Sequence, residues 1–127
     1  MHPFGTALAA GDVDAAVALV SEDVVFRSPV VFKPYHGRAA VALILHAVAR
    51  VFEDFRYTRA LGAPGAADHA LVFTARIGEF EVEGCDFLHL DDNGAIDELT
   101  VMVRPLTGAH ALADAMKAQL TAAQDGV

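Results

Sequence analysis

The chain has 127 residues, the length of one ordinary domain. Hydrophobic residues make up 54% of it, yet no apolar run reaches the roughly 18 to 20 residues that a membrane-spanning helix needs. A formal charge of −8, without any cluster of basic residues, argues against a nucleic-acid partner. The N-terminus shows neither a basic region nor a long apolar core, so we expect no signal peptide and a cytoplasmic location.

The residue types present give little support for metal binding or redox chemistry. The single cysteine, Cys85, excludes an internal disulfide and a zinc site built on thiolates. The histidines are scattered without the spacing of four residues that places two ligands on one helix face. We therefore expect no bound metal and no cofactor.

The first third of the chain predicts a helix, a strand and a second helix. Asp12 suits the N-cap of a helix with the apolar face Val13, Ala16, Val17 and Val20. Residues 23–29 then alternate as a strand that directs Phe26 and Ser28 to the same side. After a loop that closes on Gly37, a second helix presents the stripe Val41, Ile44, Leu45, Val48 and Phe52.

The rest of the chain predicts a series of strands. Asp91 to Gly94 forms a strong hairpin signal, because Asn and Gly accept the positive φ that such turns require. Helices followed by strands in series indicate an α+β architecture, with helices packed on one face of a curved sheet. The expected strands span residues 55–61, 70–77, 79–90 and 96–104.

A last helix follows the strands. Thr107 can cap it, and its apolar face extends through Leu112, Met116 and Leu120. We expect this helix over about residues 108–123, with fraying in the tail 122–127. It can cover either the sheet or the open end of the fold.

Two segments, 10–38 and 81–105, together resemble the nuclear transport factor 2-like superfamily, which includes ketosteroid isomerase and the SnoaL-like polyketide cyclases. The resemblance implies a cone-shaped, cystatin-like fold with a curved, mostly antiparallel sheet and helices on its concave face. It covers the core of a single domain over 1–127, from about residue 4 to residue 105, and the C-terminal helix extends it.

Asp86 is the leading candidate for catalysis. Alternation on its strand groups it with apolar residues, and an unpaired charge there costs several kcal/mol as an order-of-magnitude estimate. Burial is expected to raise the pKa of such a carboxyl group. By the resemblance, Asp86 falls on the protonated aspartic acid of the isomerase oxyanion hole. Catalysis, ligand contact and a purely structural role all remain open for it.

Ser28 separates this chain from the isomerases. By the resemblance, those enzymes carry their proton-abstracting carboxylate at this position, and a serine hydroxyl cannot act as that base without an activator. Their phenolic oxyanion donor falls near Phe4, which has no hydroxyl. Steroid isomerisation is therefore disfavoured. Ser28 is expected either to line the pocket or to bond the backbone at the strand end.

Other polar residues are weaker candidates. His36, beside Tyr35, is expected to cap or hold a segment rather than act as a base. Tyr57 is a second possible phenolic donor whose orientation the pattern leaves open. His46 lies off its helix stripe and His89 alternates away from Asp86, so neither is expected to form a catalytic dyad.

The concave side is expected to form a pocket for a small, largely apolar molecule. One hypothesis is an isomerase, cyclase or hydratase that uses Asp86. Another is a non-catalytic module that binds a ligand or supports a partner protein, and a third is a homologue with a filled core. The expected lining, besides Asp86, is Phe26, Ser28, Leu45, Val48, Leu71, Phe73, Leu88, Leu99, Val101 and Val103.

The opposite face of the sheet is also largely apolar, with Cys85 and Phe87 on one strand and Met102 on the next. A solvated face is ordinarily more polar, so we expect a cover. The C-terminal helix is one possible cover. We favour the other, a homodimer through this outer face, because a two-fold pair buries a self-complementary patch.

Overall fold

The computed structural model describes residues 1–125 and contains four helices around one six-stranded sheet. In chain order, the elements are α1 (Pro3–Ala9), α2 (Val13–Val17), β1 (Val20–Arg27), β2 (Tyr35–His36), α3 (Arg38–Val51), β3 (Glu53–Leu61), β4 (Asp68–Ile77), β5 (Phe80–Leu90), β6 (Ile96–Arg104) and α4 (Leu106–Asp125).

The sheet has the strand order β2-β1-β6-β5-β4-β3. Consecutive strands from β3 to β6 form an antiparallel meander, and only the pairing of β1 with β6 is parallel. Irregularities in the register occur between β3 and β4, between β5 and β6, and between β1 and β6. Such bulges bend and twist strands, which suits a sheet that curls around its contents. The predicted α+β fold with a curved, mostly antiparallel sheet is confirmed.

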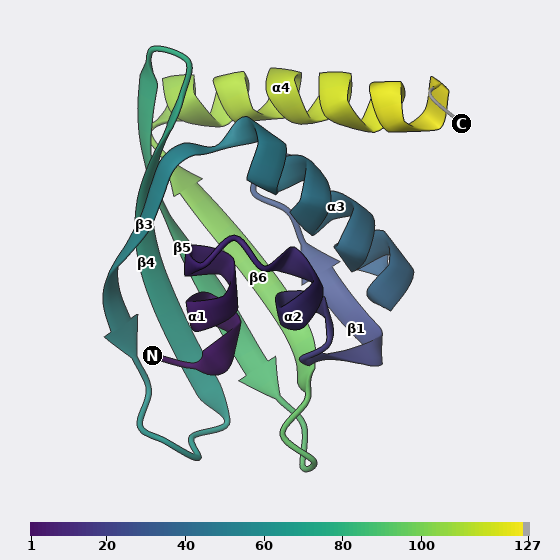
Figure 1. Ribbon diagram of the computed structural model, residues 1–127, viewed down its shortest axis with the longest axis vertical. Coiled ribbons are helices and arrows are strands. Elements are labelled where there is room, and N and C mark those ends of the chain that lie inside the picture. The colour runs from purple at the N-terminus through teal and green to yellow at the C-terminus, as the bar shows by residue number, and fades with distance from the viewer. Residues whose placement is uncertain (126–127) are drawn as a thin grey trace.

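Three helices lie against one face of the sheet, and α4 runs across its upper end (Figure 1). Helix α3 follows the predicted stripe, with Val41, Ile44 and Leu45 all buried. Its start depends on Gly37, which has a φ of 98° that other residues rarely adopt. The backbone N–H of Gly37 also donates to the carbonyl of Val24, which fixes the helix start against β1.

The N-terminal region differs from the expectation in two ways. A first helix, α1, precedes Gly11, with His2 accepting a hydrogen bond from the backbone N–H of Phe4. The helix capped by Asp12 ends at Val17, so Val20 lies in β1 and not on a helix face. Strand pairing explains the change, because the backbone N–H of Ile96 donates to Leu19 and draws the chain beside β6.

Helix α4 covers the open end of the cone. Leu112 and Met116 from its apolar face are buried among residues of the concave side. The helix continues to Asp125, two residues beyond the expected end at residue 123, and residues 126–127 of the predicted tail lie outside the described residues. No helix within residues 1–125 is long and apolar enough to cross a membrane.

Helix α4 does not pack on the outer face of the sheet. Phe87 and Met102 on this face are 42% and 59% exposed. Of the two covers expected for it, the C-terminal helix is therefore excluded.

Candidate functional site

A cavity of about 70 Å³ lies between the helices and the concave face of the sheet. Its wall is almost entirely apolar, and Asp86 is its only ionisable residue within the described part of the chain. Helices α1, α3 and α4 and strands of the sheet contribute to it. The lining residues are Phe4, Leu8, Phe26, Ser28, Pro29, Val30, Ile44, Leu45, Val48, Phe52, Phe55, Phe73, Asp86, Leu99, Val101, Leu112 and Met116.

Most of the residues expected to line the pocket meet at this cavity. The exceptions are Leu71, Leu88 and Val103, which lie on the same strands but outside the cavity wall. Leu71 is completely buried, because a terminal methyl group of its side chain lies beneath Gly5 of α1. Leu88 is likewise buried in the core. Those that line the cavity are Phe26, Ser28, Leu45, Val48, Phe73, Asp86, Leu99 and Val101.

Asp86 lies in the middle of β5 and is only 6% exposed. The hydroxyl of Tyr57, from β3, donates a hydrogen bond of 2.7 Å to its Oδ2. Within residues 1–122 no second hydrogen bond reaches this carboxyl group, and no buried side-chain oxygen is left without a partner. One carboxyl oxygen of Asp86 is therefore engaged by Tyr57, and the other is accessible from the cavity.

The surroundings of Asp86 shift its proton equilibrium. Burial raises the pKa of Asp86 to about 7, and the hydrogen bond from Tyr57 offsets part of that rise. The carboxyl group can therefore gain or lose its proton near neutral pH. Burial and the neighbouring Asp86 raise the pKa of Tyr57 far above its ordinary value of 10.0, so Tyr57 stays protonated and remains a donor.

Ser28 and Phe4 both border the cavity without offering a base or a phenol. The Ser28 oxygen accepts a hydrogen bond of 3.1 Å from the backbone N–H of Val30, so this serine lines the pocket and also bonds the backbone. Phe4 is fully buried on α1. The phenol nearest Asp86 is Tyr57 on β3, two strands from β5 in the sheet, and its hydroxyl hydrogen is donated to Asp86.

The other polar candidates lie away from Asp86. Tyr35 and His36 form the short edge strand β2, which pairs with β1 through Val25 and Phe26. His46 reaches the carboxylate of Asp14 on the molecular surface. These positions agree with structural roles.

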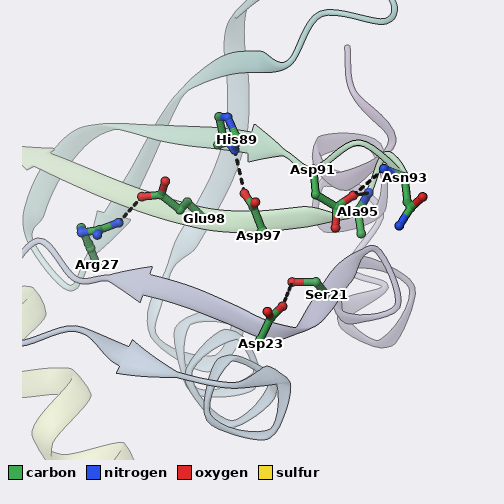
Figure 2. Close-up of polar contacts among 9 residues, drawn as sticks. All are labelled: Ser21, Asp23, Arg27, His89, Asp91, Asn93, Ala95, Asp97 and Glu98. Carbon is green, nitrogen blue, oxygen red and sulfur yellow. Dashed lines mark hydrogen bonds and ion pairs between the residues drawn. The ribbon is translucent and has the colours of Figure 1, made fainter.

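A second polar cluster extends over β1, β5 and β6 (Figure 2). His89 donates to Asp97 at 2.7 Å, and Arg27 forms an ion pair with Glu98. Potential metal-ligand atoms of His89, Asp97 and Glu98 lie within 4.8 Å of one another. Each of these carboxylates already has a cationic or N–H partner, so surface ion pairs account for the cluster.

The partner of Asp86 was not predicted from the sequence. Tyr57 lies on a strand whose register with β4 shifts just after it, between Tyr57 and Arg59, so alternation does not predict its direction. The feature that could have indicated the direction of the Tyr57 side chain is the cluster of aromatic residues to which it belongs. Phe55 and Phe73 lie 5.0 Å and 6.3 Å from the Tyr57 ring, centre to centre, and hold it against the inner face.

Comparison with known proteins places this geometry in a family. The profile of the SnoaL-like domain matches residues 3–99. A search of curated proteins gives no match.

Solved structures share the fold over most of the chain. A steroid delta-isomerase from Pseudomonas aeruginosa is 39% identical, with a TM-score of 0.90 over 97% of this chain and 90% of that one. An uncharacterised bacterial protein with a cystatin-like fold from Silicibacter pomeroyi is 38% identical, with a TM-score of 0.88 over 95% and 87%. An epoxide hydrolase/cyclase-like enzyme of pyran ring formation in salinomycin shares the fold at 20% identity, with a TM-score of 0.66 over 83% and 87%.

The match to the domain profile and the two closely similar structures agree with the cone of helices and sheet around Asp86. The chain therefore belongs to the SnoaL-like family and has the nuclear transport factor 2-like fold.

Proposed function

We propose that this protein is an isomerase- or cyclase-type enzyme that moves a proton within a small, largely apolar carbonyl compound. The observation that carries the proposal is the carboxyl group of Asp86, buried at the wall of an apolar cavity with one oxygen accessible and a pKa of about 7. A group that titrates near neutral pH is suited to give and take protons at that pH.

The geometry supports one group acting in both directions. In its ionised form, Asp86 can accept a proton from a carbon next to the carbonyl, which leaves the electron pair on the enolate. In its protonated form, it can donate a hydrogen bond to the carbonyl or return the proton to another carbon. Tyr57 fixes the carboxyl group through Oδ2 and leaves the cavity side available for these steps.

The substrate class follows from the wall of the cavity. Seventeen residues line it, and all but Ser28 and Asp86 are apolar. A volume of about 70 Å³ is well below the roughly 300 to 1,000 Å³ of sites for drug-sized ligands. The inner cavity therefore suits a small molecule or one end of a longer one. Ser28 and Phe4, which offer neither a carboxylate nor a phenol, disfavour steroid isomerisation as the activity of this chain.

Hydrogen exchange tests the proposal without knowledge of the natural substrate. Cyclohexanone is incubated with the protein in heavy water, and deuteration next to its carbonyl is followed by NMR. The wild type is expected to accelerate the exchange, and Asp86→Asn to remove roughly 100-fold or more of that acceleration. Asp97→Asn, the same change on the surface, should keep the wild-type rate. Equal rates in the wild type and Asp86→Asn contradict the proposal.

A non-catalytic binding module is the second candidate. It is favoured by the Ser28 hydroxyl, which stands where the isomerases have a carboxylate and already accepts a bond from the backbone. A binder should hold cyclohexanone with an affinity that Asp86→Asn changes, and should show no exchange above background. Calorimetry together with the exchange experiment separates the two functions.

We also propose that two chains pair through the outer face of the sheet. Phe87 and Met102 are exposed on the neighbouring strands β5 and β6, where Cys85 pairs with Met102 and Phe87 with Thr100. Light scattering at micromolar concentration should give the mass of a dimer, and Phe87→Glu should shift it toward the monomer. A monomeric mass for the wild type contradicts this pairing.

A further inference from the structure

A second hollow opens beside the inner cavity. It is a groove of about 390 Å³ between the loop that follows β1 and the outer half of α4. Val31 and Tyr35 contribute one side, and Lys117 and Leu120 the other. The groove is thus larger than the cavity and is open to solvent along α4.

The groove and the inner cavity adjoin each other. Five residues line both hollows, namely Phe26, Ser28, Val30, Ile44 and Met116. Ser28 lies where the two hollows meet. It follows Arg27, which pairs with Thr100 of β6, so Ser28 is level with Val101. Val101 in turn pairs with Asp86 of β5. Two strand spacings, about 10 Å in total, separate Ser28 from Asp86. A ligand that extends from Asp86 into the groove is therefore elongated.

Lys117 is the only charged residue among the described residues that line the groove. It is exposed, and within residues 1–122 its ammonium group makes no hydrogen bond or ion pair, not even with Asp114 one turn earlier on α4. A further hollow, between α2 and α3 near Gly11 and Ala49, has no charged residue in its described lining. The described linings of the cavity and the groove therefore include one cationic residue, Lys117, at the mouth under α4.

We infer that the ligand is an apolar molecule with an anionic end, a carboxylate, which Lys117 binds at the mouth of the groove. This inference rests on the proposed function, because it places the apolar part of the same ligand in the inner cavity near Asp86. The chain as a whole carries a charge of −8, so it has no general attraction for anions. Selection of a carboxylate must come from a local contact, and Lys117 is placed to make it.

Calorimetry with two probes of one shape tests the inference. Decanoate carries the negative charge, and methyl decanoate has the same chain without it. The wild type should bind decanoate roughly tenfold more tightly, because a hydrogen bond to an ionised group is stronger than one between neutral groups. Added salt should reduce this preference. Lys117→Met should remove the preference and leave the affinity for methyl decanoate unchanged, which also shows that the pocket is intact.

Two further variants separate a local contact from overall charge. The chain has two lysines, and Lys33 lies outside the groove lining, so Lys33→Met should keep the preference for decanoate. Lys117→Arg should keep it as well, because it conserves the charge. Equal affinity of the wild type for both probes, or a preference that survives in Lys117→Met, overturns the inference while the proposed function stands. Binding of neither probe by the wild type also overturns the inference, and the exchange of cyclohexanone decides the proposed function separately.

Discussion

Two hydrogen-bonded carboxyl groups on neighbouring strands have the same contact distance and opposite surroundings. Asp86 accepts from Tyr57 at 2.7 Å inside the cone, and Asp97 accepts from His89 at 2.7 Å near the surface. Asp86 is 6% exposed, whereas the side chain of Asp97 is 35% exposed. Burial raises the pKa of Asp86 to about 7. The hydrogen bond to Asp97 raises the pKa of His89 instead.

The apolar wall of the cavity, and not the hydrogen bond, therefore makes a carboxyl group suitable for proton transfer. A hydrogen bond to the ionised form lowers the pKa of a carboxyl group, and water near an exposed group removes the cost of its charge. Of these two groups, only Asp86 lies in an apolar wall and keeps one oxygen accessible. The cluster around Asp97 stays a set of surface ion pairs, which contribute little to stability.

The largest expected effect is a dependence of stability on pH that arises from Asp86. Between its ordinary pKa of 3.8 and its folded pKa of about 7, the folded chain keeps the proton and the unfolded chain releases it. Rising pH therefore destabilises the fold over this window, by about 4 kcal/mol for this group. Urea unfolding at about pH 4 and about pH 8 should show Asp86→Asn gaining that amount relative to the wild type.

The matching surface change provides the control for this prediction. Asp97→Asn removes a carboxylate near the surface and should follow the wild type closely, apart from a small difference in the range where His89 titrates. A constant difference between the wild type and Asp86→Asn contradicts the account, because it means that Asp86 titrates alike in the folded and unfolded chain.

The next largest effect on stability is expected at Gly84, where the chain packs tightly beside Asp86. A Cβ on Gly84, two residues before Asp86 on the same face, would lie 2.2 Å from the ring of Phe73 and 2.9 Å from the carbonyl of Met102. Gly84→Ala is expected to lower the free energy of unfolding by about 1 to 3 kcal/mol through overpacking. Cys85→Ala, on the outer face of the same strand, serves as the comparison and should cost less in the same denaturation experiment. Equal costs contradict the contrast between the two faces.

Removal of the Tyr57 hydroxyl tests how much its hydrogen bond lowers the pKa of Asp86. The hydrogen bond from Tyr57 lowers the pKa of Asp86, so Tyr57→Phe should raise that pKa. We expect a rise of about one pH unit, because a hydrogen bond to a charged group contributes about 1.5 kcal/mol. An NMR titration of the Asp86 carboxyl carbon measures it. A fall in the pKa means that Tyr57 does not stabilise the ionised form.

The smallest effect is expected at the surface pair. Asp97→Asn should lower the pKa of His89 toward its ordinary value of 6.5, since the hydrogen bond from His89 to Asp97 is the main cause of its rise. A proton NMR titration of the His89 ring reports this change. The midpoint of denaturation should hardly move, and a large loss of stability contradicts the view of this cluster as a surface feature.

The sequence predicts the fold where periodicity is regular. The apolar stripe of α3 and the alternation of β5 predict which residues face inward, so the pattern of apolar residues alone is enough to assign Asp86 to the inner face. Residues 91–94 form the tight connection that the hairpin signal indicates, with the Asp91 side chain accepting from the backbone N–H groups of Asn93 and Ala95 (Figure 2).

Other features depend on contacts that no local pattern contains. Helix α1 is short, and burial of Phe4 against the cavity supports it more than its own propensity does. The orientation of Tyr57 depends on a register shift with β4, and the place of α4 depends on Leu112 and Met116 meeting the concave side. The partner of Asp86 and the extent of the cavity could therefore be found only in three dimensions.

The pKa of Asp86 itself decides whether this carboxyl group can serve as both acid and base. A carbon NMR titration of the wild-type protein, with Asp86→Asn to assign the signal, should show the carboxyl group of Asp86 titrating with a midpoint of about 7. A midpoint near the ordinary value of 3.8 would mean that the cavity wall does not hold the proton on Asp86, and would contradict its role as the acid and base of this site.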